Sequence, residues 1–395
     1  MKTVLIIGGG YGGIKALECF CTYKSETLNI ILIDQHSYHY LQTESYNLLV
    51  SNISLEKTFV YLPTLIAGFG NNFSFICDEA LHIEGQTLVC SHSRLNFDYL
   101  IIATGSITKF LQDFHAKSSY VLGVKSLRAA LHAKQYFEEE LFDRLDGCSK
   151  QKTFTIVVIG GGLSGVELAA EMRAYCNRYS KENTLSCGTI HIKLITRHIL
   201  KGQSDNVVTR VTSRLKAIGV ELIEHRVNRV EEKHLVLDDS QTITFDFAMV
   251  TGGIEPSIFI NNLSFSKSKH GFLEVDSYLR VQENIFAIGD AAALHDIDNN
   301  PLAPTAQSAE ASGTIAAQNI LASIEQKPLH RSNIKLQGLA IALGGKHALV
   351  ITPFGFVIQG FLGWIIKQAI EKTYKIALKR KAAKGYSQIQ TCLKN

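Results

Sequence analysis

Two glycine-rich runs have the residue types and the spacing that bind a dinucleotide. The run Gly8–Gly13 directly follows the aliphatic residues Val4–Ile7, and Gly160–Gly165 directly follows Ile156–Ile159. Each matches G-x-G-x-x-G at an expected strand-to-helix turn. The first glycine permits the tight turn, the second lets a diphosphate approach the backbone, and the third lets the helix pack on the strand. Two such sites are typical of an enzyme that transfers hydride between a nicotinamide and a flavin.

The segments around the first run predict a βαβ unit. Its second strand, over Asn29–Ile33, ends at Asp34, where an acid would bind the 2′-hydroxyl of a ribose. A later strand over Phe97–Ala103 ends in Thr104 and Gly105.

The second run begins another βαβ unit. Strands are expected at 190–196 and 247–252, with a helix at 204–218 between them, and a strand at 285–289 and a helix at 304–322 come later. We therefore expect an α/β fold with two Rossmann-like dinucleotide-binding domains, the second inserted in the first. The boundaries would be 1–115 and 255–330 for the first domain, 116–254 for the second, and 331–395 for a C-terminal region.

Composition limits the partners. A composition of 46% apolar and 19% charged residues is typical of a globular protein. The net charge of +4 gives no reason to expect nucleic acid as a partner. The basic residues concentrate in 367–384, which holds seven Lys or Arg and one acid, Glu371. Eight cysteines are scattered without C-x-x-C or zinc spacing, so no metal site is expected. No signal peptide is visible, which favours free thiols in a reducing compartment.

Four motifs in this order resemble the flavin-dependent pyridine-nucleotide oxidoreductases: the first glycine run, Ala103-Thr104-Gly105, the second glycine run, and Gly289-Asp290. The resemblance covers nearly the whole chain. It implies that the first run holds FAD and the second holds NAD(P)H. The residues implied for FAD are Gly8, Gly10, Gly13, Asp34, Thr104, Gly105 and Asp290, and those for NAD(P)H are Gly160, Gly162 and Gly165.

Within this class the chain resembles type II NADH:quinone oxidoreductase. The features shared are the run 160–169, His39-Tyr40-Leu41, Ala306-Gln307-Ser308-Ala309, and the stretch 338–350 followed by a helix. The resemblance implies that Glu167 lies near the nicotinamide and flavin and assists proton handling. The plainer interpretation is a carboxylate that stabilises the start of its helix.

Gln307 is implied as the residue that hydrogen-bonds a quinone carbonyl, against the alternative of a surface glutamine at a helix start. Glu310, one turn later, is expected to be solvated.

One departure from the family pattern concerns the nucleotide. The strand that should end in a ribose-binding acid ends in Thr196 and Arg197. A 2′-phosphate would meet no repulsion there and could meet a cation. The resemblance favours NADH, while these residues leave NADPH or dual use open.

The C-terminal region has an apolar run, Ala348–Ile366, interrupted by Pro353 and Gly355. We expect a strand at 347–351 and a helix at 356–384. Residues 357, 358, 361, 362, 365 and 369 would form an apolar face with basic flanks, which suits a helix lying in the plane of an anionic membrane surface. The alternative is a helix buried against its own domain or in a homodimer.

The expected function is non-proton-pumping NAD(P)H:quinone oxidoreduction on the cytoplasmic face of the inner membrane, with the protein attached peripherally. The first alternative is sulfide:quinone oxidoreductase, which would need thiols near the flavin. The second is a soluble NAD(P)H-dependent flavoprotein reductase of a small redox protein. The third is a nucleotide-sensing protein without turnover. Dithiol chemistry is excluded because residues 38–43 contain no cysteine pair.

Overall fold

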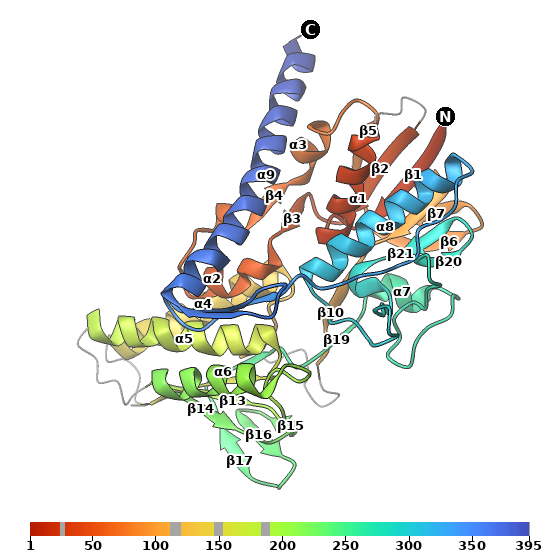
Figure 1. Cartoon of the computed structure of the whole chain (residues 1–395). Helices are drawn as coiled ribbons and strands as arrows, with labels where there is room; N and C mark the ends of the chain where they lie inside the picture. Colours follow the sequence, from red (N-terminus) through yellow and green to blue (C-terminus); the bar gives the residue numbers. More distant parts are fainter. Residues whose placement is uncertain (24–27, 111–119, 146–152, 183–189, 395) are drawn as a thin grey trace.

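The computed structural model describes residues 1–23, 28–110, 120–145, 153–182 and 190–394, without the side chains of 144–145 and 392–394. Two sheets, one mixed and one parallel, form its frame, and a long helix near the C-terminus lies along one side (Figure 1). Each sheet has its own apolar core. The first core includes Ile6, Leu32 and Phe286, and the second includes Val158 and Phe247, all fully buried.

The first sheet has six strands in the order β20-β21-β9-β1-β2-β5. Its central strands pair in parallel, and only β20 and β21 pair antiparallel. The bounds are β1 Lys2–Ile7, β2 Leu28–Asp34, β5 Phe73–Cys77, β9 Tyr99–Ile102, β20 Arg280–Gln282 and β21 Ile285–Ala287. Helices α1 (Tyr11–Thr22) and α8 (Ala306–Ile324) lie side by side over this sheet (Figure 1).

The second sheet has five parallel strands in the order β11-β18-β12-β13-β14. Their bounds are β11 Val121–Leu122, β12 Phe154–Ile159, β13 Ile190–Ile195, β14 Val220–Ile223 and β18 Phe247–Val250. Helices α4 (Leu127–Leu145), α5 (Leu163–Glu182) and α6 (Asp205–Ile218) accompany it. Helix α6 ends at Gly219, whose φ of 95° suits the left-handed turn that commonly closes a helix.

The chain leaves the first sheet after β9 and returns to it at β20. Strands β10 (Ser106–Thr108) and β19 (Ile254–Pro256) pair antiparallel between the two passages. The predicted α/β class, with two Rossmann-like units and a C-terminal helix, is confirmed. The predicted domain boundaries stay a prediction.

Short elements complete the fold around the two sheets. The strands are β3 Tyr38–Tyr40, β4 Phe59–Tyr61, β6 Ala80–Glu84, β7 Thr87–Cys90, β8 Arg94–Asn96, β15 Val227–Glu231, β16 His234–Leu237 and β17 Thr242–Thr244. The helices are α2 Ser45–Leu49, α3 Leu62–Ala67 and α7 Ile258–Asn262, with 3₁₀ turns at Gln42–Glu44, Leu55–Lys57 and Gly289–Ala291.

The C-terminal region is an antiparallel sheet followed by one helix. The sheet comprises β22 (Leu339–Ala342), β23 (Ala348–Ile351) and β24 (Val357–Gly360), and α9 spans Phe361–Lys394. The predicted helix start at residue 356 is therefore wrong. Residues 357–360 pair with β23 instead. A short apolar run is compatible with a strand or a helix, and here the neighbouring strand decides the outcome.

Helix α9 packs closely against α3. A Cβ atom on Gly385 would lie 1.9 Å from the carbonyl oxygen of Thr64, and one on Gly68 would lie 2.1 Å from that of Lys381. Only glycine fits at these two points, so the helices cross with their backbones in contact. Within the described ranges, none of the helices combines the length and the apolar character needed to cross a bilayer.

Candidate functional site

The first glycine-rich loop has the geometry of a dinucleotide-binding turn. Gly8 has φ 107°, and a Cβ there would lie 2.3 Å from the carbonyl oxygen of Ala103. A Cβ on Gly13 would lie 2.0 Å from the oxygen of Gly8, which shows how tightly α1 packs on its strand. At Gly10, by contrast, nothing lies within 4 Å of that position. The exposed backbone of Gly10 is thus open to a diphosphate, the role expected of the middle glycine.

The second loop repeats this geometry. Gly160 has φ 120°, a Cβ on Gly165 would lie 1.8 Å from the oxygen of Gly160, and the space beside Gly162 is empty to 4 Å. The two loops also end their strands in the same register, since Ile7 is opposite Ile33 and Ile159 is opposite Ile195.

The N-terminus of α1 is uncapped, which fits a bound diphosphate. No side chain accepts a hydrogen bond from its first N–H groups, and its first turn holds no acid. Helix α8, in contrast, begins with a complete capping box between Thr305 and Ser308. Free N–H groups at a helix start attract anions, so α1 offers FAD the site that its fingerprint predicts.

Asp34 closes the first loop. Its Oδ2 accepts a hydrogen bond from the N–H of Gly9 at 2.7 Å, and its Oδ1 accepts one from the N–H of His36 at 2.8 Å. The carboxylate therefore lies over the glycine loop at the end of β2.

The other residues predicted for FAD lie at the same edge of the first sheet. Thr104 and Gly105 follow β9, and Asp290 follows β21, so they join Gly8 and Asp34 at the carboxyl ends of neighbouring strands. Ligands of open α/β sheets bind at this edge.

Two side chains hold the carboxylate of Asp290. Its Oδ2 accepts from Ser106 Oγ at 2.6 Å and lies 2.9 Å from Lys125 Nζ. Lys125 was not predicted, because a single lysine after an unremarkable loop carries no sequence signal.

His39 connects the first loop to α9. Burial lowers the pKa of His39 to about 4, so its ring is neutral at physiological pH. Nδ1 then donates to the carbonyl oxygen of Gly9 at 2.8 Å, and Nε2 accepts from the hydroxyl of Tyr374 at 3.3 Å. The ring of Tyr11 packs against both His39 and Tyr374.

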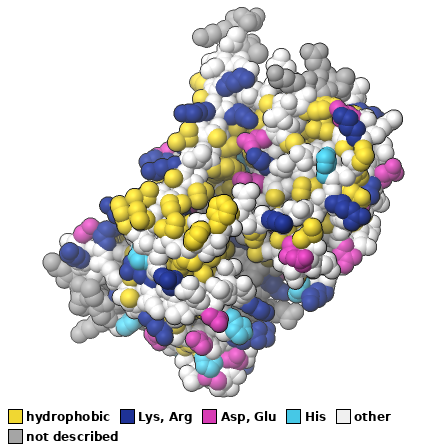
Figure 2. Space-filling model, in the orientation of Figure 1, with side chains coloured by type: hydrophobic (Ala, Val, Ile, Leu, Met, Phe, Trp, Pro, Cys, Tyr) yellow, Lys and Arg dark blue, Asp and Glu magenta, His cyan; other side chains and the backbone are white. Residues whose placement is uncertain are grey.

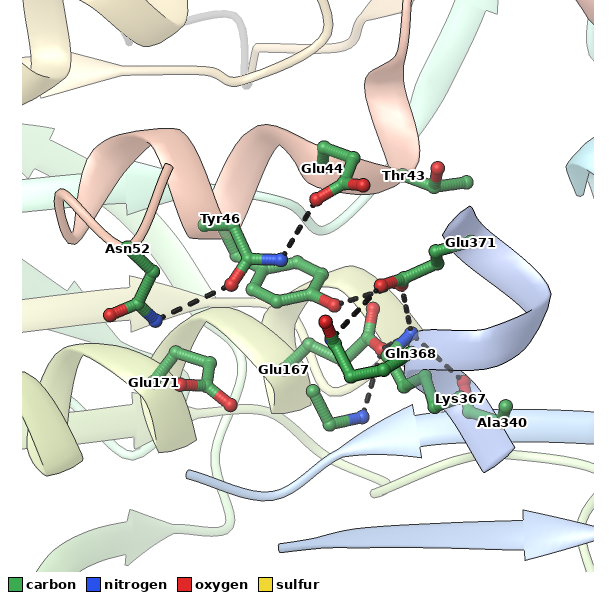
Figure 3. A network of polar contacts seen from close by, with 12 residues as sticks. Thr43, Glu44, Tyr46, Asn52, Glu167, Glu171, Ala340, Lys367, Gln368 and Glu371 are labelled. Carbon is green, nitrogen blue, oxygen red and sulfur yellow. Dashed lines mark hydrogen bonds and ion pairs between the residues drawn. The ribbon is translucent and has the colours of Figure 1, made fainter. Parts of the chain in front are cut away.

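Glu167 belongs to a buried polar network that joins α5 to α9 (Figure 3). It is the fifth residue of α5, and its Oε1 accepts from the N–H of Ala342 at 2.9 Å. The same oxygen lies 3.0 Å from Lys367 Nζ, which is also 2.9 Å from Glu371 Oε1. Glu167 thus forms an ion pair with Lys367 and does more than stabilise the start of its helix.

Lys367 is charged although it is buried. Burial opposes its charged form, but Glu167, Tyr46 and Glu371 outweigh that effect and raise its pKa well above the ordinary range. Burial raises the pKa of Glu371, whose carboxylate also accepts from the hydroxyl of Tyr46 at 3.1 Å. The sequence had suggested only that Lys367 belonged to a basic helix face, since helical spacing does not show which turn meets a carboxylate.

Glu171, one turn after Glu167, is a second buried carboxyl on α5. It accepts hydrogen bonds from the N–H groups of Gly344 and Gly345 at 3.2 and 3.1 Å. Burial raises its pKa to about 7 despite these bonds. No sequence pattern pointed to this residue.

Gln307 lies at the start of α8 and is exposed. Its Oε1 accepts from the N–H of Gln337 at 2.9 Å, and its Nε2 donates to the carbonyl oxygen of Gly338 at 3.4 Å. Glu310 is half-buried and its pKa is raised by burial, so the expectation that it would be fully solvated is wrong.

Gln307 and Glu167 contact one segment of the chain. Gln307 binds the backbone of Gln337 and Gly338, and Glu167 binds that of Ala342, at the far end of β22. Lys367 donates to the carbonyl oxygen of Ala340 between them, at 3.4 Å. Residues 337–342 therefore bring the two predicted catalytic residues to a common strand beside α9.

Five cysteines are described, and all are free thiols. Burial raises the pKa of Cys19 and Cys90, and raises that of Cys176 to about 12. Cys148 and Cys187 lie outside the described residues, as does the side chain of Cys392. One described group, formed by His225, Asp238 and Asp239, brings three potential metal ligands together, far from any predicted site residue in sequence.

Comparison with known proteins agrees with the fold and identifies the family. The family model for pyridine nucleotide-disulphide oxidoreductases matches residues 2–313. The NADH dehydrogenase-like protein YutJ of Bacillus subtilis is 26% identical, with 88% of this chain and 91% of that protein covered. A type II NADH:quinone oxidoreductase of Staphylococcus saprophyticus is 23% identical, with 94% of each chain covered.

Solved structures share the fold. NDH2 from Plasmodium falciparum, solved with NADH, superposes with a TM-score of 0.82 over 98% of both chains at 16% identity. The sulfide:quinone oxidoreductase of Aquifex aeolicus gives 0.79 over 96% of this chain and 92% of that one, at 18% identity. The resemblance inferred from the four ordered motifs is confirmed: the chain belongs to the pyridine nucleotide-disulphide oxidoreductase family.

Proposed function

We propose that the protein is an NAD(P)H:quinone oxidoreductase that works on a membrane surface. The observation that carries this proposal is the convergence of Gln307 and Glu167 on residues 337–342, next to a helix whose outer face is apolar. Relatives named as quinone oxidoreductases, which match over most of their length, support the same activity.

The residues of the first loop fit FAD, and those of the second fit a nicotinamide nucleotide. The diphosphate of FAD would bind the N–H groups at the start of α1, near Gly10. Asp34 would lie at the ribose and Asp290 near the ribityl chain. Thr104 and Gly105 would border it at the end of β9. Bound FAD supplies the chemistry, because it accepts hydride from the nicotinamide and passes two electrons to the acceptor.

The second loop would hold NAD(P)H at Gly160, Gly162 and Gly165. Glu167, on the helix that follows, has its carboxylate 3.0 Å from Lys367 Nζ. A carboxylate paired with a buried ammonium can hold a proton near a reacting ring, which is the role proposed for Glu167.

A quinone ring would hydrogen-bond the side chain of Gln307. In the structure that amide is held by the backbone of Gln337 and Gly338, which fixes its orientation at the edge of β22. The exposed position of Gln307 leaves room for a ligand on its outer side.

The membrane surface would contact α9 and the turn before it. Phe361 is 55% exposed and Leu362 65%, and Phe354 and Phe356 in the turn between β23 and β24 are 86% and 70% exposed. Hydrophobic side chains gather over the lower part of α9, with basic side chains around them (Figure 2). This face of α9 is exposed although its other side packs on α3 and β23, so the helix is only partly buried against its own domain.

Fewer basic residues than expected are free to meet lipid. Lys367 is buried, and Lys375 lies 2.5 Å from Glu44 Oε1. Lys372, Lys379, Arg380 and Lys384 remain exposed, each worth about 1 kcal/mol beside an anionic surface. We propose a peripheral position, on the cytoplasmic face of the inner membrane, and a homodimer stays a prediction.

The test is stopped-flow reduction of the bound flavin. We expect NADH or NADPH to bleach the flavin and a short-chain quinone to reoxidise it. Bleaching by sulfide alone would establish the sulfide:quinone alternative, which the raised thiol pKa values of Cys19, Cys90 and Cys176 disfavour. Reoxidation only by a small redox protein would establish the soluble reductase.

Gln307→Ala tests the quinone site. It should slow reoxidation by quinone and leave bleaching by NAD(P)H unchanged, whereas Gln318→Ala, an exposed glutamine of the same helix, should change neither rate. Equal loss of both half-reactions would remove Gln307 from the quinone site.

Phe361→Asp tests the membrane surface. It should weaken flotation with vesicles that contain anionic lipid, and Phe142→Asp, at a phenylalanine of α4 that is 62% exposed, should not. Unchanged flotation of the Phe361 variant would place the contact elsewhere.

A further inference from the structure

The two glycine-rich loops allow a residue-by-residue comparison within one chain. The N–H of Gly8 donates to the carbonyl oxygen of Ile33 at 2.8 Å, and the N–H of Gly160 donates to that of Ile195 at 2.9 Å. The residues that follow these acceptors, Asp34 and Thr196, therefore occupy the same position in the two sites.

Both side chains lie over the second residue of their loop. A Cβ on Gly9 would be 3.4 Å from Asp34 Oδ2, and a Cβ on Gly161 would be 2.6 Å from Thr196 Oγ1. In sites of this kind an acid at this position binds the ribose 2′-hydroxyl and would repel a 2′-phosphate. Thr196 puts a neutral hydroxyl there instead.

The turn after Thr196 is fixed against the loop. Thr196 Oγ1 donates to the carbonyl oxygen of His198 at 3.0 Å and accepts from its N–H at 3.3 Å. The N–H of Leu200 donates to the carbonyl oxygen of Gly161 at 2.7 Å. The backbone on both sides of Arg197 is thus held beside the nucleotide loop.

Arg197 is exposed in the middle of this turn. Within the described residues its guanidinium makes no hydrogen bond, ion pair or ring contact. The segment 190–204 contains Lys193, Arg197 and Lys201 and no acidic residue. The nearest acid by register is Glu224, which follows the end of β14 and is exposed.

We infer that the second loop accepts the 2′-phosphate of NADPH, with Thr196 and Arg197 as the residues that set this specificity. A guanidinium binds a phosphate through two parallel N–H donors, which an uncharged turn could not supply. NADPH is then the preferred hydride donor. The inference deepens the proposed function, because it rests on the second loop being the nicotinamide nucleotide site.

A binding experiment tests the phosphate contact without turnover. Adenosine 2′,5′-bisphosphate and adenosine 5′-monophosphate, which differ only in the 2′-phosphate, would each be titrated into the FAD-loaded protein by calorimetry. We expect the 2′-phosphorylated compound to bind about tenfold more tightly, and Arg197→Ala to abolish that difference. Arg229→Ala, at an exposed arginine of β15 in the same part of the chain, should preserve it.

Equal affinity for the two compounds, no binding of either, or an unchanged preference in the Arg197 variant would overturn the inference. Kinetics provide the second measurement. Arg197→Glu should lower kcat/KM for NADPH at least tenfold more than for NADH, and Thr196→Asp should shift the preference toward NADH. If Glu224→Gln instead weakens NADH alone, the ribose is bound by Glu224 and the assignment to Thr196 is wrong.

The outcomes separate this inference from the proposed function. Flavin reduction reports on the nucleotide and reoxidation by quinone reports on the acceptor. A protein that prefers NADPH and fails to reduce quinone would uphold the nucleotide site and refute the proposed acceptor. A protein that reduces quinone with NADH alone would do the opposite.

Discussion

The helices that follow the two glycine-rich loops are held in place by different forces. Helix α1 packs on α8 by shape, since a Cβ on Gly313 would lie 2.3 Å from the carbonyl oxygen of Gly12. Helix α5 also packs through apolar residues in the second core, but it adds buried polar contacts to the C-terminal region. Its Glu167 pairs with Lys367, and its Glu171 accepts from the backbone of Gly344 and Gly345.

The two dinucleotide sites therefore depend on different contacts. The first loop depends mainly on backbone contact within the first sheet and its helices, with one link to α9 through His39 and Tyr374, whereas α5 has charged and polar partners supplied by the C-terminal region. Changes of volume should therefore act on the FAD side, and changes of charge or pH should act on the NAD(P)H side.

The largest effect is expected from Lys367→Met. It leaves Glu167 and Glu371 buried without their cation, and breaking a buried ion pair in this way costs about 3–5 kcal/mol. Urea unfolding of the FAD-loaded protein would measure the loss. Lys372→Met, at an exposed lysine of the same helix, should cost less than about 0.5 kcal/mol. Similar stability of the two variants would mean that charge does not hold α5.

Glu171→Gln tests the pH dependence of the same helix. Because the folded pKa of Glu171 is raised to about 7, the folded state keeps a proton that the unfolded state releases near pH 4.5. The contribution of this carboxyl to stability is thus greatest below pH 4.5 and falls as pH rises to 7, by about 3 kcal/mol.

The variant should match the wild type in its response to pH below pH 4.5, and should lose less stability between pH 4.5 and 8. Unfolding free energies of both proteins across this range would measure the difference. Parallel curves would show that Glu171 is ionised in the folded protein throughout.

Gly313→Ala tests the shape-dependent contact of α1. The added methyl group would force α1 and α8 apart, and such overpacking costs about 2 kcal/mol. FAD should dissociate more readily, and the loss should not vary with pH. Gly253→Ala, where the new atom would be 3.6 Å from the side chain of Lys109, is the control. A pH-dependent loss at Gly313 would contradict the comparison.

The smallest effect is expected from Asp34→Asn. The amide oxygen can still accept from the N–H of Gly9, but the bond loses its charge, which should weaken FAD binding by about 1 kcal/mol, or fivefold. Asp98→Asn is the matched control, because Asp98 accepts from the N–H of Thr3 at the same 2.7 Å at the opposite end of the sheet. Equal loss of FAD in both variants would make the effect one of general stability.

The dinucleotide loops were predictable because their chemistry is local. The turn, the open backbone at Gly10 and Gly162, and Asp34 at the end of its strand all follow from spacing within a single βαβ unit. The order of the motifs then placed Asp290 at the same edge of the sheet.

The network around Lys367 could not be predicted in this way, because its members come from parts of the chain far apart in sequence. Nothing in the spacing of Glu167, Tyr46 and Lys367 shows that they meet. The strand at 357–360 was missed for a related reason, since its character depends on the partner β23 and not on its own residues. Long-range pairing decides both cases.

The buried Lys367 also bears on how the protein is made. Helix α9 follows every other described element, so during synthesis both sheets emerge before the cation that Glu167 requires. A chain that stops before α9 would expose the surface of α3 and retain an unpaired carboxylate. We expect cells to degrade such a product as misfolded, so the last helix would serve as a check that translation has reached it.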